Sequence, residues 1–170
     1  MGRRAEIETF EGGGGGEMNF KVEPIPAEIT SEVRRSMVSP QYRSLAANSS
    51  VANGYGPCRS CLRVFEQGRD RRISFTYNAF DGLSDLPDPG PVFIHENECE
   101  AFEGGIPEDI LELPVYLEAF GKDSVIVRRV RMDRSTVNDQ LLGLLDRPDV
   151  QFVNLRNAEA GCFIARVVRT

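Results

Sequence analysis

VYLEAFGKDSVIVRRVRM, residues 115–132, contains two strand-length runs on either side of a short polar turn. The turn is formed by Gly121, Lys122 and Asp123, which separate the run that ends at Phe120 from the run that begins at Val125. Two extended runs joined by so few residues pair in opposite directions, because a short turn reverses the chain. This hairpin predicts a sheet whose strands are mostly antiparallel.

Five further strands are predicted around the hairpin, from short apolar or alternating runs bounded by turn-forming residues. They occupy residues 19–23, 72–79, 91–95, 150–156 and 162–169. The clearest is 72–79, in which Ile73, Phe75 and Tyr77 alternate with polar residues. Side chains of a strand point to opposite faces in turn, so this pattern indicates a half-buried strand.

Two helices and one shorter helical segment are predicted between the strands. The first opens at Pro26 and places Ile29 and Val33 on one face, four residues apart. The second follows residue 135 and ends before residue 148, and one or two helical turns are expected after residue 107. The sequence therefore predicts an α+β fold with a mostly antiparallel sheet and two or three short helices in a single domain.

Three segments are predicted to lack regular structure. Residues 1–17 include five consecutive glycines, Gly12 to Gly16, and are expected to be a disordered Gly-rich N-terminal extension. Residues 39–57 and 81–90 are rich in turn-forming residues and are expected to be loops. Residues 18–170 are expected to form a single globular domain, because the chain is long enough for one substantial core.

The charge of the chain limits its expected partners. A formal net charge of −6 argues against a general nucleic-acid binder, which needs a basic face to replace counterions. Four arginines cluster at positions 128, 129, 131 and 134, where a solvated charged surface is favoured over a phosphate site. No apolar run approaches the length of a membrane span and no secretory signal opens the sequence, so we expect no membrane contact and a cytoplasmic location.

Four cysteines and a single histidine carry the most specific chemical signal. Cys58 and Cys61 form a C-x2-C pair after a Gly-Pro turn, and thiolates at this spacing can converge on one ion. His95 and Cys99, in IHENEC, follow with an H-x3-C spacing and can supply two more ligands. These four residues predict a tetrahedral zinc site.

Two other uses of these residues stay open at this point. Free cysteines are often small buried hydrophobic residues, in which case His95 would be an ordinary hydrogen-bonded strand residue. A reactive thiol pair is the second alternative, because Arg59 lies inside the motif and positive charge lowers the pKa of a thiol. The βαβ setting of a thioredoxin-like protein is missing upstream of Cys58, which ranks the redox use last. Disulfides are not expected in a reducing cytoplasm.

Three blocks of sequence resemble, in their order, a family of small bacterial proteins described as domain of unknown function 1203. The blocks are PCRSCL, GPVFIHENEC and VNLRNAEAGCFIARV, and the matching residues are Cys58, Arg59, Cys61, Leu62, Gly90, Pro91, Phe93, His95, Cys99, Asn157, Gly161 and Cys162. The similarity runs from about residue 18 to the C-terminus. It implies a bacterial, cytoplasmic protein, brings no assigned activity, and suggests that the three blocks belong to one site.

The same blocks contain four candidate contacts for a small anion, namely Arg59, Arg156, Asn157 and Cys162. A guanidinium and an amide near a loop can bind a carboxylate. The alternative is that Arg156 pairs with a surface carboxylate while Asn157 shapes the NAEAG turn.

Two functions are compared on this basis. The first is a binding or interaction module with one structural zinc in the Cys58, Cys61, His95 and Cys99 site, and with partners not assigned. The second is a metal-dependent or cysteine-based enzyme that acts on a small anionic substrate, with catalytic residues not assigned. A pocket that gathers Arg59, His95, Arg156 and Cys162 would favour the enzyme.

Overall fold

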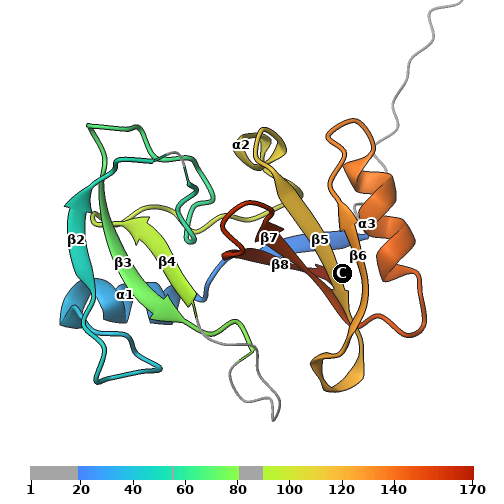
Figure 1. Cartoon of the computed structure of the whole chain (residues 1–170), viewed down its shortest axis with the longest axis horizontal. Coiled ribbons are helices and arrows are strands. Elements are labelled where there is room, and N and C mark those ends of the chain that lie inside the picture. The colour runs from blue at the N-terminus through green and yellow to red at the C-terminus, as the bar shows by residue number, and fades with distance from the viewer. Residues whose placement is uncertain (1–18, 55, 81–89) are drawn as a thin grey trace, which may run out of the picture.

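The computed structural model describes residues 19–54, 56–80 and 90–170. The extension expected at residues 1–17 and nearly all of the loop expected at 81–90 lie outside these residues. The described parts form three short α-helices and eight strands in two antiparallel sheets, which confirms the predicted α+β class in a single domain. Figure 1 shows the two sheets side by side, with α1 beside the smaller sheet and α3 beside the larger one.

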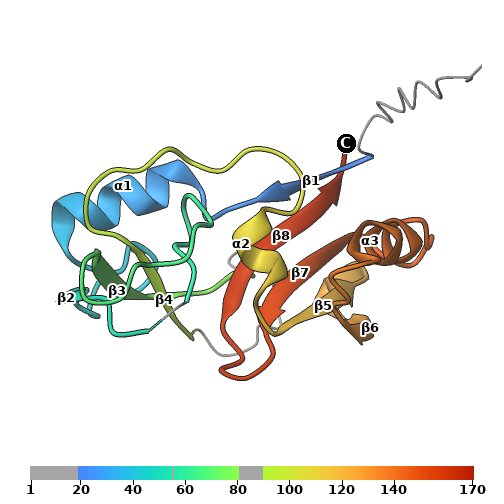
Figure 2. The ribbon, with the colours of Figure 1, turned by 90° about the horizontal axis from the view of Figure 1, so that it is seen from above.

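The larger sheet has the strand order β1-β8-β7-β5-β6, and all its neighbouring strands are antiparallel. Its strands are β1 (Phe20–Glu23), β5 (Val115–Phe120), β6 (Ile126–Arg131), β7 (Phe152–Asn157) and β8 (Phe163–Arg169). β5 and β6 are the predicted hairpin, joined through a short 3-10 turn, η1 (Lys122–Ser124). Phe20 of β1 lies opposite Arg169 of β8, so both ends of the described chain meet at one edge (Figure 2).

The smaller sheet has the order β2-β3-β4, with β2 (Asn48–Val51), β3 (Arg71–Tyr77) and β4 (Gly90–His95). β2 lies inside the segment 39–57, so the prediction of a loop throughout that segment is wrong. The sequence of β2, NSSV, has no apolar alternation and is mostly exposed. Pairing with β3 holds it extended, from Asn48 opposite Ser74 to Val51 opposite Arg71.

The helices are α1 (Ala27–Ser36), α2 (Glu108–Leu111) and α3 (Val137–Leu145). α1 starts after Pro26 as predicted and buries Val33. α3 buries Leu141, Leu144 and Leu145 and packs against β5 and β7. Among the described residues, no helix combines the length and the apolar character needed to cross a membrane.

Two hydrophobic cores lie in the molecule, one for each sheet. The first gathers side chains of the larger sheet, α2 and α3, and the second gathers those of α1 and the smaller sheet. The CRSC loop, residues 56–65, contributes to both. Leu62 is fully buried in the first core, whereas Cys58, Cys61 and Phe65 belong to the second. This loop is therefore part of the connection between the two sheets.

Candidate metal centre

The CRSC loop is a tight turn closed by its own backbone. Cys58 N–H donates to the carbonyl of Arg63, and Leu62 N–H donates to the carbonyl of Cys58, each at 2.9 Å. Leu62 has a φ of 59°, a left-handed conformation that is uncommon for a residue other than glycine. Because its side chain is fully buried among the residues of the larger sheet, packing can hold this conformation.

The loop lies against the edge of β4, which carries the histidine. Arg59 N–H donates to the carbonyl of Phe93 at 2.9 Å, so the loop covers backbone groups that would otherwise be unpaired at this edge. His95 is the last residue of β4, and Cys99 follows in the connection after it. Two segments that are distant in sequence are thus joined directly at the candidate site.

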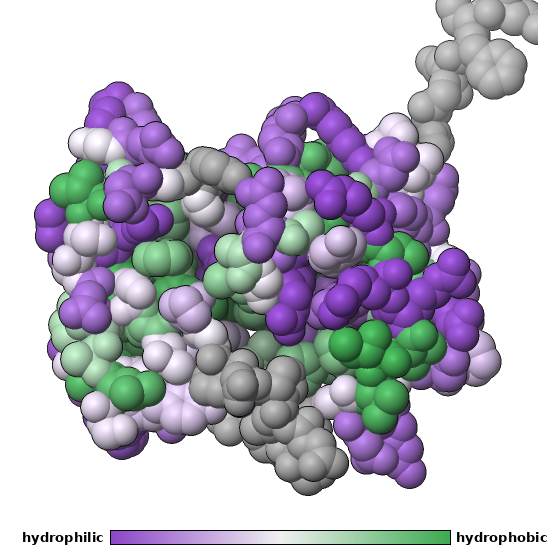
Figure 3. All heavy atoms as spheres, in the orientation of Figure 1, coloured by the Kyte–Doolittle hydropathy of each residue, from purple (hydrophilic) through white to green (hydrophobic). Residues whose placement is uncertain are grey.

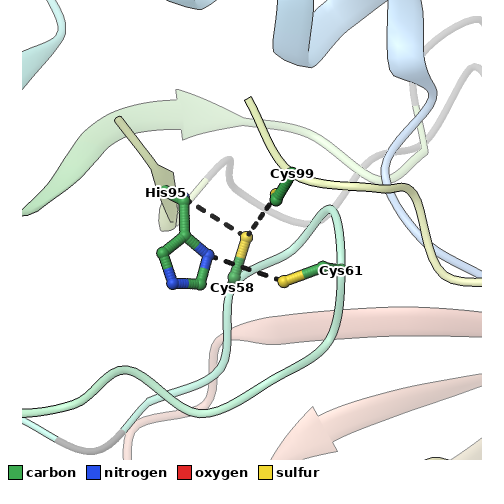
Figure 4. A group of neighbouring side chains, drawn as sticks. All are labelled: Cys58, Cys61, His95 and Cys99. Atoms are coloured by element: carbon green, nitrogen blue, oxygen red, sulfur yellow. Dashed lines mark hydrogen bonds between the residues drawn. The ribbon is translucent and has the colours of Figure 1, made fainter. Parts of the chain in front are cut away.

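Four potential ligands meet where the loop touches β4. The donor atoms of Cys58, Cys61, His95 and Cys99 all lie within 4.8 Å of one another. The Sγ atoms of Cys58 and Cys99 are 3.8 Å apart, and the Sγ of Cys61 is 3.5 Å from Nδ1 of His95 (Figure 4). All four cysteines of the chain are free thiols, so no disulfide competes for these atoms. The group can hold a metal ion.

The surroundings of the sulfur atoms suit negative charge. The backbone N–H groups of Ser60 and His95 donate to Sγ of Cys58, at 3.4 and 3.3 Å. Arg34 of α1 donates from one guanidinium nitrogen to Sγ of Cys99 at 3.4 Å and from Nε to the carbonyl of His95 at 3.0 Å. Three thiolates around a divalent cation leave one excess negative charge, which a neighbouring arginine offsets.

The imidazole of His95 is held on both sides. Its Nδ1 faces Cys61, and its Nε2 lies 3.4 Å from a carboxylate oxygen of Asp70. The ring of Phe65 lies 4.6 Å from the imidazole, centroid to centroid. A carboxylate on the distal nitrogen fixes the tautomer in which the other nitrogen is free to bind a metal.

The pKa values in the cluster are displaced in opposite directions. Hydrogen bonds with Cys58 and then with Cys99 lower the pKa of the Cys61 thiol. Hydrogen bonds with Cys61 and then with Cys99, together with burial, raise the pKa of the Cys58 thiol. The contact with Cys61 raises the pKa of His95 to about 10. These directions favour an ion pair between Cys61 and His95 in the absence of a metal, and a bound cation would displace the remaining protons.

The four residues predicted as anion contacts do not join this cluster as ligands. Arg59 is buried, donates to the carbonyls of Pro57 and Phe163, and has its pKa lowered by burial to about 10. Arg156 and Cys162 line a separate cavity of about 120 Å³ between the sheets, which neither Arg59 nor His95 lines. The pocket that would favour an enzyme therefore contains two of its four expected residues, Arg156 and Cys162, and lacks Arg59 and His95.

The remaining anion candidates have structural partners. Arg156 pairs through Nε with Glu118 at 2.9 Å, a carboxylate that is buried and not on the surface, and donates to the carbonyl of Gly161. Oδ1 of Asn157 accepts hydrogen bonds from the backbone of Glu159 and Ala160, as expected for a residue that shapes the NAEAG turn.

Sequence reasoning missed Arg34 and Asp70, which contact the cluster from outside the motif. Arg34 comes from α1 and Asp70 from the turn before β3, so neither stands near a cysteine in the sequence. The sequence carried no signal for either of them. Only the packing of α1 and β3 beside β4 brings them to the sulfur atoms and the imidazole.

The protein therefore has an α+β fold of two antiparallel sheets. A candidate metal centre of three cysteines and one histidine lies where the two sheets are joined. Residues 55–169 match the family described as Protein of unknown function (DUF1203), and the chain belongs to that family, as its sequence blocks indicated. Neither a curated protein nor a solved structure matches the chain.

Proposed function

We propose that the protein is a binding or interaction module that holds one structural Zn²⁺ through Cys58, Cys61, His95 and Cys99. The observation that carries this proposal is that four donor atoms converge within 4.8 Å at the loop that joins the two cores. Three thiolates and one imidazole are a ligand set typical of structural zinc. Such a set closes the tetrahedral shell and leaves no position for a catalytic water.

The position of the cluster supports a structural role. The carbonyl of Arg59 accepts a hydrogen bond from Ile25, between β1 and α1, and the carbonyl of Ser60 accepts one from Phe102. Nε of Arg59 donates to Phe163 of β8 at 2.7 Å. A metal at this point would fix a loop to which β4, β8 and the segment after β1 are all bonded, and would thereby hold the two sheets together.

The enzyme alternative has less support. The guanidinium groups of Arg59 and Arg156 are already bonded to carbonyls or to a buried carboxylate, which leaves little of either for an anionic substrate. Cys162 lies in a different cavity from the three clustered cysteines. These contacts favour the structural site over the enzyme.

The test is the metal content of protein purified without an affinity metal column, together with its thiol reactivity. We expect about one zinc per chain by elemental analysis. A thiol reagent should react rapidly with Cys162 alone in the native protein, because metal-bound thiolates are protected. After addition of a zinc chelator, the three clustered cysteines should react as well.

Cys99→Ser and Cys162→Ser form a matched pair, since both side chains are partly exposed. Cys99→Ser should lower the zinc content or affinity, whereas Cys162→Ser should leave it unchanged. If Cys99→Ser proves insoluble, the chelator experiment on the unaltered chain still decides the question. Protein without metal, whose thiols react identically with and without chelator, would contradict the proposal.

A further inference from the structure

β6 is an edge strand of the larger sheet. Met132 N–H donates to the carbonyl of Val115, so Met132 directs its backbone toward β5. Backbone groups alternate in direction along an antiparallel strand, so Val130 and Arg128 do the same, whereas Arg129 and Arg131 direct theirs away from the sheet. The carbonyl of Arg131 accepts a hydrogen bond there from the Gln140 side chain. Within the described part of the chain, no strand pairs with that outer side.

The outer edge carries positive charge on both faces. Arg129 and Arg131 project to the face of Glu118, which lies opposite Arg129 in the register, and Arg128 projects to the face of α3. Arg129 is paired with Glu118. The guanidinium groups of Arg128 and Arg131 have no hydrogen-bond or ion-pair partner among the described residues. Two arginines on one short strand are thus available to a partner.

An apolar component adjoins the charged one. A groove of about 340 Å³ runs between β6 and α3, where Val130 and Leu144 supply apolar surface among the polar or charged Arg128, Asp139, Gln140 and Arg147. At the start of the strand, Val125 and Ile126 are 62% and 46% exposed. Figure 3 shows this apolar surface at the hairpin turn, beside the hydrophilic surface that covers the rest of the strand. The edge therefore offers apolar contacts as well as charge.

The pairing of β6 with β5 contains an ion pair between a carboxylate and an arginine. Glu118 of β5 lies opposite Arg129, and one of its carboxylate oxygens is 2.6 Å from a guanidinium nitrogen. A carboxylate directly opposite an arginine on a neighbouring strand is a stabilising cross-strand pair. A strand on the outer side of β6 could form an equivalent pair with Arg131, whose guanidinium is not bonded to Glu118.

A second copy of the chain does not fit this edge. Antiparallel pairing of β6 with β6 of a second copy, in its two central registers, places Arg129 opposite Arg129 or Arg128 opposite Arg128, and like charges directly opposite each other are destabilising. Charged residues on an edge strand commonly prevent this kind of self-association. The same charges favour a segment of opposite sign.

We propose that the outer edge of β6 is a docking site for an extended acidic segment of a partner protein, which adds to the larger sheet as a further strand. Its acidic side chains, at alternate positions, lie on the face of Arg129 and Arg131, where the unpaired guanidinium of Arg131 binds one of them. Its intervening apolar side chains lie toward the groove with α3, near Val130 and Leu144. Backbone hydrogen bonds supply affinity, and the alternating pattern supplies selectivity. The proposal does not depend on the metal centre.

The test is the binding of a fluorescent peptide, Glu-Val-Glu-Leu-Glu-Val, to the full chain by fluorescence anisotropy. The control peptide is Gln-Val-Gln-Leu-Gln-Val, which keeps the shape and loses the charge. We expect the glutamate peptide to bind about 10-fold more tightly, which corresponds to about 1.4 kcal/mol. Two further versions of the glutamate peptide carry N-methyl groups at alternate residues, one at the odd positions and one at the even positions. Only one version should lose binding, because strand addition requires the N–H groups that point toward β6.

Matched charge reversals locate the binding surface. Arg131→Glu should weaken binding of the glutamate peptide about 10-fold. Arg35→Glu, at an exposed position on α1 away from this sheet, should change it less than about 2-fold. Both variants have the same net charge, so a general electrostatic effect would lower the two affinities equally and would overturn the proposal.

Other outcomes reassign the edge. Equal affinity for the two peptides, or no binding of either, overturns the proposal. Displacement of the peptide by a single-stranded oligonucleotide, lost in Arg131→Glu, would assign the edge to nucleic acid instead. The N-terminal sequence of this chain is itself acidic at Glu6, Glu8 and Glu11. If the glutamate peptide binds only after these three residues are changed to Gln, the N-terminal segment of the chain competes with the peptide and is itself the occupant of the edge.

Discussion

Asp70 approaches His95 from the side opposite the sulfur atoms, with its carboxylate 3.4 Å from Nε2. A carboxylate in this position orients a metal-binding imidazole and raises its basicity. We expect Asp70→Asn to lower zinc affinity about 10-fold, because the amide keeps the shape and loses the charge. Competition with a chromophoric chelator measures this affinity.

Glu96 provides the control, since it is adjacent to His95 in sequence but lies on the other face of the strand. Its carboxylate pairs with Ser49 and Arg71 and not with the imidazole. Glu96→Gln should therefore leave zinc affinity unchanged. Equal losses in the two variants would show that Asp70 acts through the general negative charge near the site and not through its contact with His95.

At the scale of single elements, the β5–β6 hairpin depends on the absence of a side chain at Gly121. A Cβ atom there would lie 2.7 Å from the carbonyl oxygen of Asp149 and 2.9 Å from a methyl carbon of Val127. We expect Gly121→Ala to lower the free energy of unfolding by about 1–3 kcal/mol, because backbone atoms must move to admit the methyl group. Urea denaturation measures the change.

Gly143 is the opposite case, in the middle of α3. A Cβ atom at this position meets nothing within 4 Å, and the residue is exposed. Gly143→Ala should therefore raise the free energy of unfolding by about 0.5–1 kcal/mol, since alanine loses less backbone entropy than glycine in a helix. If both alanine variants shifted stability in the same direction, the close approach at Gly121 would not be the cause.

The elements that could be predicted from sequence are those with a strong local pattern. The hairpin at 115–132 and the helix that follows Pro26 were predicted because apolar periodicity and turn residues agree there. β2 was missed because Ser and Asn dominate its four residues, and only its pairing with β3 holds it extended. The division of the strands into two sheets likewise depends on distant pairings that no local pattern reveals.

The candidate site divides in the same way. The spacing of Cys58 with Cys61, and of His95 with Cys99, indicated a group that the structure brings within ligand distance. The contact between Arg34 and Cys99 joins residues 65 positions apart, and no motif contains both. A motif records ligands that are neighbours in sequence, whereas the residues that orient those ligands come from whichever elements pack around them.

For the whole molecule, the proposed metal should matter most at the junction of the two sheets. Removal of zinc by a chelator should accelerate hydrogen exchange at the amides of Arg59, Ile25 and Phe102, whose bonds all involve the CRSC loop. Amides in the middle of the β5–β7 pair should keep their protection, because that ladder lies within the larger sheet. Exchange followed by NMR resolves these sites individually.

A uniform rise in exchange over both sheets would instead mean that metal removal unfolds the entire domain. That result would still support a structural metal, but it would contradict a role confined to the junction. Unchanged exchange at Arg59 and Ile25 would show that the loop holds its shape without the ion.

The pairing of β1 with β8 has a mechanical consequence. Residues 19 and 170 leave the sheet at the same end of this pair, where Thr170 N–H donates to the carbonyl of Asn19. A force that pulls these two residues apart loads the ladder hydrogen bonds one after another, as in opening a zipper, and not all at once. β1 would peel away first, and the tension would then reach the CRSC loop through Ile25, whose N–H is bonded to Arg59.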